Sequence, residues 1–228
     1  MTVKYHPNLI QGSEEWFKAR TGLLTASEMK LIVTEKTLKA AANEKAASHL
    51  YELAAQRLTG YVEPHYISDD MLRGKDDENE AKFKYEENYG RITDMGFITN
   101  DKFGFTLGYS PDGLVGDDGL VEVKSRRQKF QIQTIAEGKM PDEYQIQAQT
   151  GLLVSERKWC DFISYCGGLP MFTLRVEPDK KIQDAIIEAS TQFHEKMDKL
   201  LKDYADRLAD TTARLVATER SKESEMYI

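Results

Sequence analysis

Residues 104–125 read GFTLGYSPDGLVGDDGLVEVKS, and this stretch decides the fold class. Three short β-type runs, 104–109, 114–115 and 120–125, are separated by the turn sequences 111–113 and 116–119. Short strands joined by tight, Gly- and Asp-rich turns are typical of antiparallel hairpins. The middle of the chain is therefore predicted to form an antiparallel meander.

Helical patterns flank this meander on both sides. Before it, helices are predicted over 13–20, 25–33, 37–57 (stopped by Gly60) and 68–89 (ended by Gly90), with a further strand at 95–99. After it, helices are predicted over 128–137 and 142–155, and strands over 159–166 and 172–176. Mixed elements in this order predict an α/β fold with a central mixed β-sheet flanked by helices.

A long amphipathic helix is expected to close the fold. Its apolar residues recur at spacings of three and four, which places them on one stripe: Ile182, Ile186, Ala189, Phe193, Met197, Leu200, Tyr204 and Leu208. Packing against the sheet and contact with another subunit both fit this pattern.

Length and composition favour one soluble domain. The chain has 228 residues without internal repeats or a Pro-rich linker, so we expect a single domain over 1–217 and a flexible tail over 218–228. No apolar run is long enough for a membrane helix, and the first ten residues lack a secretion signal, which favours the cytoplasm. The net charge of −7 argues against a protein coated in positive potential. The distribution of charge matters more than this sum, because binding responds to the local potential.

The meander also carries the residues that suggest chemistry. Glu122 and Lys124 are two apart on a predicted strand and so project from the same face. Asp112 lies in the turn that begins the partner strand, where its carboxylate and the backbone carbonyl of Val123 can approach Glu122. Mg²⁺ prefers such oxygen ligands, and Lys124 could orient water or neutralise charge on a phosphate.

A third carboxylate is available from the helix predicted over 68–89. Glu78 shares a face with Gly74, Ala81 and Tyr85, which directs it inward. An inward acid normally needs a partner or a metal ion. A solvated position on this highly charged helix is the alternative.

These residues resemble a known nuclease signature. Asp112, Glu122 and Lys124 resemble the PD-(D/E)xK motif, and the surrounding sequence resembles the phage lambda exonuclease family of viral alkaline exonucleases. Five blocks carry the resemblance in family order: Trp16-Phe17-Lys18-Ala19-Arg20 with Thr25-Ala26-Ser27-Glu28, Gly74-Lys75 with Glu78-Asn79, Ser110-Pro111-Asp112-Gly113-Leu114, Glu122-Val123-Lys124, and Gln147-Ala148-Gln149.

The resemblance implies a restriction-endonuclease-like core and a processive, Mg²⁺-dependent 5′-to-3′ exonuclease. Such an enzyme digests linear double-stranded DNA to mononucleotides and leaves 3′ overhangs for recombination by strand annealing. By motif, Asp112, Glu122 and the Val123 carbonyl would bind one or two Mg²⁺ ions, for which Mn²⁺ is a possible substitute. Glu78 would complete the acidic site, directly or indirectly, and Lys124 would be the catalytic lysine.

The resemblance also implies a site for the DNA end. Arg20, Ser27, Ser110 and Gln147 match positions that bind the terminal 5′ phosphate. Met71 matches an apolar wedge that separates the end base pairs.

Partners and alternatives follow from the same resemblance. The family implies a ring-shaped homotrimer, a single-strand annealing protein as partner, and a phage or prophage protein acting in the cytoplasm of a bacterial host. Two other interpretations remain open: a structure- or sequence-specific endonuclease on the same core, and a non-catalytic DNA-end-binding module.

Overall fold

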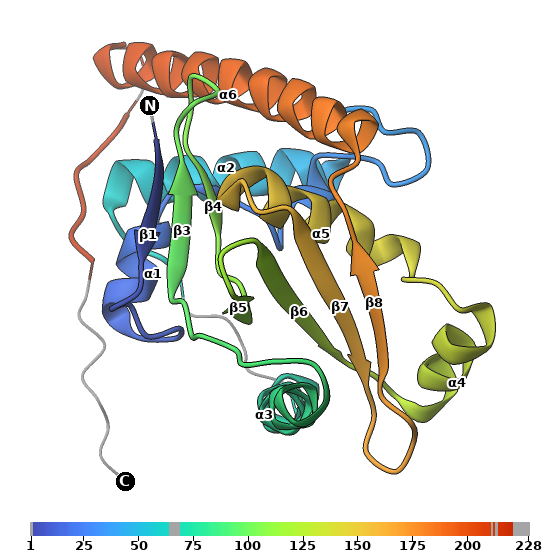
Figure 1. Cartoon of the computed structure of the whole chain (residues 1–228). Helices are drawn as coiled ribbons and strands as arrows, with labels where there is room; N and C mark the ends of the chain where they lie inside the picture. The colour runs from blue at the N-terminus through green and yellow to red at the C-terminus, as the bar shows by residue number, and fades with distance from the viewer. Residues whose placement is uncertain (1, 64–68, 211, 213, 221–228) are drawn as a thin grey trace, which may run out of the picture.

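The computed structural model describes residues 2–63, 69–210, 212 and 214–220, without the side chains of residues 69–71. Helices and strands are mixed along these parts of the chain (Figure 1). In order they are β1 (Val3–His6), α1 (Glu14–Arg20), β2 (Leu24–Thr25), the 3₁₀ turn η1 (Met29–Leu31), α2 (Glu44–Thr59), α3 (Asp69–Asn88), β3 (Phe97–Asn100), β4 (Leu107–Tyr109), β5 (Gly113–Val115), β6 (Gly119–Ser125), α4 (Gln128–Glu137), α5 (Asp142–Ser155), β7 (Trp159–Tyr165), β8 (Phe172–Val176) and α6 (Lys180–Ala209).

The strands form two mixed sheets of four strands each, which confirms the α/β class. The strand orders are β1-β3-β4-β2 and β5-β6-β7-β8, with β2–β4 and β6–β7 parallel and the other pairs antiparallel. The expected meander in one central sheet is therefore divided between β4 and β5. Pro111 lies at this division, where it has no N–H for a ladder, and its carbonyl accepts a hydrogen bond from Gln11 Nε2 instead (2.8 Å).

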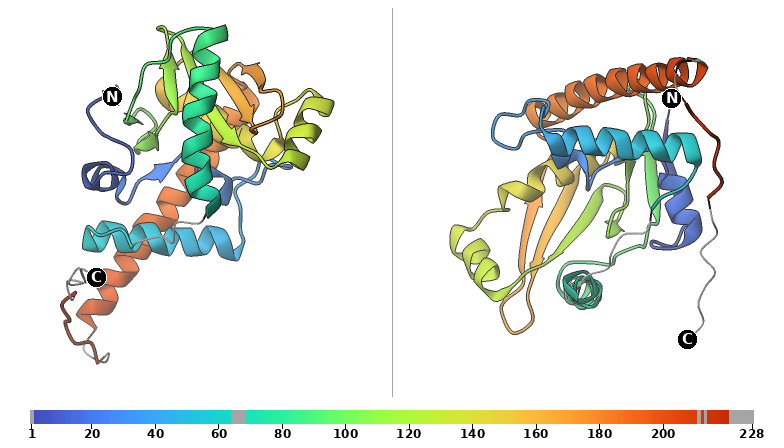
Figure 2. Two further views of the ribbon diagram at one scale, coloured as in Figure 1. Left: turned by 90° about the horizontal axis from the view of Figure 1, so that it is seen from below. Right: turned by 180° about the vertical axis from the view of Figure 1, so that it is seen from behind.

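Helices α5 and α3 cover opposite faces of the second sheet (Figures 1 and 2). Leu120 of β6 shares a core with Leu152 of α5, whereas Val121 and Val123 pack with Tyr85 of α3. Successive strand residues point to opposite faces. The even-numbered residues of β6 therefore face α5.

Two helix starts differ from the expected ones. Thr25, expected to open a helix over 25–33, instead pairs with Gly108 as part of β2, and only the single turn η1 follows. The helix expected from residue 37 begins at Glu44, because Asn43 caps it by accepting from the Ala46 N–H (3.0 Å). Residues 34–41 form a loop in which the Thr34 N–H bonds the Lys39 carbonyl.

Most other elements agree with their sequence signals. Ser13 caps α1 by accepting from the Trp16 N–H, and Gly60 ends α2 in the left-handed conformation that favours glycine. Both α4 and α5 have the expected bounds. Strand β1 was not expected, and it completes the first sheet by pairing with β3.

The closing helix α6 packs mainly on α2 and α5 (Figure 1). Its apolar stripe is buried as far as Met197, whereas Tyr204 and Leu208 are exposed. None of the helices in the described ranges is long and apolar enough to span a membrane. Of the tail predicted over 218–228, residues 221–228 lie outside the described part of the chain.

Candidate active site

Glu122 is a buried carboxylate held by three donors. It lies in the middle of β6 with 1% of its surface exposed. Tyr109 Oη donates to Glu122 Oε2 at 2.9 Å, Lys124 Nζ donates to Oε1 at 2.7 Å, and Gln147 Nε2 also donates to Oε1. These bonds connect β4, β6 and α5, so both carboxylate oxygens are fixed in the core of the fold.

Asp112 lies beside Glu122, as the sequence predicts. Its Oδ2 accepts from the Val123 N–H at 2.6 Å, which attaches the turn after β4 to β6. Burial, followed by the charges of Glu122 and Glu78, raises the pKa of Asp112 well above its ordinary value, and Lys124 and the Val123 N–H only partly oppose this. Two carboxylates in so little water would be stabilised by a cation.

The oxygen donors of this pair fit a hard divalent ion. A strand residue directs its N–H and C=O to the same side, so the Val123 carbonyl faces the side on which Asp112 lies. Within the described ranges, no three Asp, Glu, His or Cys side chains are grouped closely enough to form a metal cluster. Two carboxylates and a carbonyl therefore suit an ion that keeps several water ligands, as Mg²⁺ does.

Lys124 places a positive charge next to both carboxylates. Burial acts to lower its pKa, but Glu122 and Asp112 outweigh burial, and the pKa is raised above its ordinary value. Its Nζ also lies 5.5 Å from the ring centre of Tyr144, which comes from the first turn of α5. Lys124 is therefore a charged donor held at the acidic pair.

Glu78 approaches from a different direction than Glu122. It belongs to α3, which covers the opposite face of the sheet, and its Oε1 pairs with Lys82 Nζ at 2.6 Å. Its side chain is 32% exposed. Glu78 acts on the charge of Asp112, as noted above, while its direct contact is Lys82.

Arg20 forms the centre of a second polar cluster. Its Nη1 donates to Ser110 Oγ (3.0 Å) and its Nη2 to Thr25 Oγ1 (3.2 Å), and Thr25 Oγ1 lies 3.3 Å from Ser27 Oγ. Three of the four residues predicted to bind a 5′ phosphate are thus joined in one network through Thr25. Gln147 lies instead against Glu122, at the acidic pair.

The Arg20 guanidinium is well supported by its surroundings. It lies 4.2 Å from the ring centre of Trp16, whose Nε1 donates to Ser110 Oγ at 3.0 Å. Burial lowers the pKa of Arg20, and the charge of Glu28 partly opposes this. Arginine remains protonated in proteins, so the cluster presents a permanent positive charge.

Helix α2 fixes the loop that follows Arg20. The Gly22 N–H donates to Gln56 Oε1 (2.8 Å), and Arg57 Nε donates to the Gly22 carbonyl (2.9 Å). Gly22 has φ of +69°, and a Cβ there would lie 2.5 Å from the Arg57 side chain. Only glycine suits this turn, which holds Arg20 close to Ser110.

Two residues of the site were not predicted from the sequence, and the side chain of one predicted residue is not described. Tyr109 bonds Glu122 in the acidic pair, and Thr25 bonds Arg20 and Ser27 in the second cluster, but neither is among the predicted site residues. Tyr109 directly precedes Ser110 at a strand end, which was the available signal. Met71 lies in the first turn of α3, and its side chain is outside the described part of the structure.

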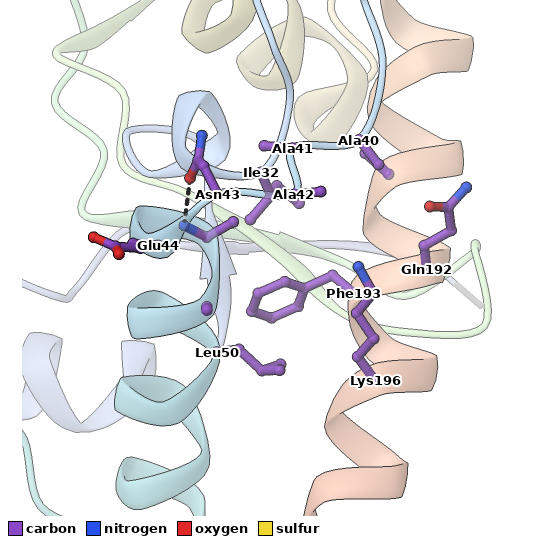
Figure 3. A pocket seen from close by; sticks show the side chains of 13 residues that line it. Ile32, Ala40, Ala41, Ala42, Asn43, Glu44, Leu50, Gln192, Phe193 and Lys196 are labelled. Atoms are coloured by element: carbon purple, nitrogen blue, oxygen red, sulfur yellow. Dashed lines mark hydrogen bonds between the residues drawn. The ribbon is translucent and has the colours of Figure 1, made fainter.

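A mostly apolar pocket lies elsewhere in the described part of the chain. Residues 40–43, the start of α2 and the middle of α6 line it with mostly apolar groups, including Leu50 and Phe193 (Figure 3). None of its lining residues is one of the predicted site residues. The predicted site residues therefore lie outside this pocket.

Comparisons with known proteins identify the family and the fold. The profile of the YqaJ-like viral recombinase domain matches residues 15–158. An alkaline exonuclease from Laribacter hongkongensis, LHK-Exo, has a similar structure with a TM-score of 0.76 and 34% identity, covering 88% of this chain and 100% of that one. The same exonuclease in complex with dAMP gives a TM-score of 0.72 and 35% identity over 85% and 99% of the two chains.

A phage-related exonuclease from Haemophilus somnus is similar in fold, with a TM-score of 0.56 and 15% identity over 80% of this chain and 96% of that one. Among curated proteins, none matches this chain.

Proposed function

The chain belongs to the family of YqaJ-like viral recombinase domains, and from this membership and the site geometry we propose that it is a Mg²⁺-dependent 5′-to-3′ exonuclease. Its substrate is the end of linear double-stranded DNA. It releases mononucleotides processively and leaves 3′ single-stranded overhangs for strand annealing.

One observation carries this proposal: Ser110 and Asp112 are two residues apart, and each belongs to a different polar cluster. Ser110 Oγ accepts from Arg20, and Asp112 Oδ2 accepts from the Val123 N–H beside Glu122. A terminal phosphate bound at Arg20 would therefore place the next phosphodiester near the acidic pair. Because Ser110 and Asp112 are only two residues apart, the spacing between the two clusters favours removal of one nucleotide at a time from a 5′ end.

Asp112, Glu122 and the Val123 carbonyl would hold one or two Mg²⁺ ions, with Mn²⁺ as a substitute. A bound Mg²⁺ supplies positive charge and Lewis acidity next to the scissile phosphate. Tyr109 and Gln147 keep the Glu122 carboxylate oriented, and Glu78 adds negative charge from the α3 side. Lys124 stabilises the negative charge that develops on the phosphate during attack by water.

The Arg20 cluster supplies recognition of the DNA end. The planar guanidinium offers two parallel donors that match a phosphate, and Ser27 and Ser110 add neutral hydroxyls. Thr25 instead donates its hydroxyl hydrogen to Glu28 Oε2 (2.8 Å). Binding energy at this point serves to position the scissile bond. Gln147 contributes from the side of Glu122, and Met71 is the proposed apolar wedge at the end base pairs.

The proposal extends to the assembly. We propose that the chain acts as a ring-shaped homotrimer with a single-strand annealing protein as partner, in the cytoplasm of a bacterium that carries the phage or prophage. The ring would explain processivity. Light scattering that finds only monomers, together with processive digestion, would contradict the ring.

The preference for a 5′ phosphate tests the proposed function. We expect wild type to digest a 5′-phosphorylated duplex much faster than the same duplex with a 5′ hydroxyl. Arg20→Ala should remove most of this difference, whereas Lys18→Ala, which removes an equal charge from the same helix, should preserve it. Equal wild-type rates on the two duplexes would contradict recognition of the end by this site. Cutting of closed circular DNA would favour an endonuclease instead.

A further inference from the structure

A second cation, Arg126, follows Lys124 directly after the end of β6, on the face that carries Glu122 and Lys124. The Arg126 N–H donates to the Tyr165 carbonyl at 2.7 Å, which continues the pairing of β6 with β7 by one residue. Side chains of an extended strand alternate between faces, so Arg126 projects on the side of Lys124, about 6.6 Å further along the strand. The side chains of Glu122, Lys124 and Arg126 therefore lie in a line along one face.

The two cations are held against one aromatic ring. Lys124 Nζ lies 5.5 Å and Arg126 Cζ 5.2 Å from the ring centre of Tyr144, which itself stacks on Phe162. The Arg126 side chain is only 9% exposed. Lys124 is paired with the buried Glu122, whereas the acidic partner of Arg126 is the exposed Glu143.

Within the part of the chain that the structure describes, the Nε of Arg126 is a buried donor without an acceptor. The Nη1 of Arg126 donates to Glu143 Oε1 (2.8 Å) and to Tyr144 Oη. Arg175 shows what the Nε edge of a guanidinium can bind: Nε and Nη2 of that residue each donate to a carboxylate oxygen of Asp161 at 2.8 Å. An unpaired buried donor is costly, and an oxyanion would satisfy it.

We propose that Arg126 binds a phosphate of the degraded strand, the one that lies one nucleotide inward from the scissile bond. This inference rests on the proposed function and adds a third site to it. The sites follow the order Arg20 for the terminal phosphate, Asp112 and Glu122 with Lys124 for the scissile phosphate, and Arg126 for the next. Glu143 and Tyr144 hold Nη1, which leaves the Nε and Nη2 edge for two phosphate oxygens.

The test uses 5′-phosphorylated duplexes with one uncharged methylphosphonate linkage. The modified linkage is the second of the degraded strand, between nucleotides 2 and 3, or the sixth as a control. Release of the first nucleotide is measured under single-turnover conditions. For wild type, we expect the neutral second linkage to slow release about 10- to 100-fold, the usual effect of losing a hydrogen bond to a charged group. The neutral sixth linkage should have little effect.

Variants then identify the residue that senses this charge. Arg126→Ala should be slow on the unmodified duplex and should lose nothing more when the second linkage is neutral. Arg126→Lys keeps the charge without the fork and should retain part of the sensitivity, and it replaces the alanine variant if that one does not fold. Arg127→Ala removes the same charge from the exposed neighbour and should retain the full wild-type sensitivity.

Two results would overturn the inference. One is a wild type that is insensitive to the neutral second linkage, and the other is an Arg126 variant that shows the full additional loss. The affinity for the same duplexes in Ca²⁺ gives a second readout that does not require cleavage, and the same pattern is expected there. Failure of the proposed function is distinct, because wild type would then not digest the unmodified duplex from its 5′ end.

Discussion

Tyr109 and Glu122 are joined by a hydrogen bond of 2.9 Å between two side chains that are both almost completely buried. Burial, followed by the charge of Glu122, raises the pKa of Tyr109 well above its ordinary value, so the phenol stays protonated and donates. The bond connects the last residue of β4 to the middle of β6, across the division between the two sheets.

Tyr109→Phe removes this donor and keeps the ring. Loss of a hydrogen bond to a charged group costs about 1.5–3 kcal/mol, and we expect the half-saturating Mg²⁺ concentration to rise and kcat to fall about 10-fold or more. The matched control is Tyr85→Phe, which removes the bond from another buried tyrosine to Asp161 (2.6 Å). The control should lower the free energy of unfolding without changing the Mg²⁺ requirement. An unchanged Mg²⁺ titration for Tyr109→Phe would assign Tyr109 to structure alone.

Lys124→Ala should remove the positive charge at the carboxylate pair. Loss of one preorganised electrostatic contact commonly lowers kcat about 10²- to 10³-fold, whereas Mg²⁺ binding should persist. Steady-state kinetics checks this prediction. Lys158→Ala is the control, because Lys158 forms an exposed ion pair with Asp118. Rates within a few-fold of wild type would exclude Lys124 from the reaction.

Asp112→Asn should separate folding from metal binding. The raised pKa of Asp112 means that its charge destabilises the metal-free fold, so the variant should melt at a higher temperature than wild type in EDTA. Mg²⁺ should raise the Tm of wild type and leave that of Asp112→Asn unchanged. Differential scanning fluorimetry with Asp118→Asn as control measures both effects. An equal rise of Tm with Mg²⁺ in the Asp112 variant would show that the cation binds at another site.

His194 should make the fold sensitive to mild acid. Its ring stacks on Phe105, with ring centres 4.3 Å apart. Burial lowers the pKa of His194, although its Nδ1 donates to the Ser190 carbonyl. The charge of Arg57 also lowers this pKa, and the charge of Asp198 raises it. The unfolded chain therefore binds a proton first, and stability falls as the pH drops through about 6.5. Chemical denaturation from pH 8 to pH 5 should show a smaller loss for His194→Gln than for wild type. Parallel pH dependences would contradict this role.

Local signals predicted much of the fold and of the acidic site. Ser13 and Gly60 act at helix ends through bonds within a few residues, so their roles can be read from adjacent sequence. Asp112 and Glu122 come together because the short hairpin between them returns the chain on itself. The division of the strands into two sheets involves a distant partner, Gln11 at Pro111, which no local pattern reveals.

Long-range contacts also explain why the positions of some site residues could not be predicted from the sequence. The side on which α3 packs is set by Val121, Val123 and Tyr85, and it separates Glu78 from the face of Glu122. The bonds of Gln147 and Tyr109 to Glu122 depend on how α5 and β4 meet β6. Spacing along the chain contains no information about either arrangement.

Digestion of end-labelled linear duplex tests the central claim most directly. With Mg²⁺, a duplex phosphorylated and labelled at its 5′ ends should release labelled mononucleotide at once, whereas a 3′ label should remain in long single strands. EDTA or Asp112→Ala should abolish the release, while Asp118→Ala should not affect it. Release of the 3′ label first, internal cuts, or normal digestion by Asp112→Ala would contradict a 5′-to-3′ exonuclease built on Asp112, Glu122 and Lys124.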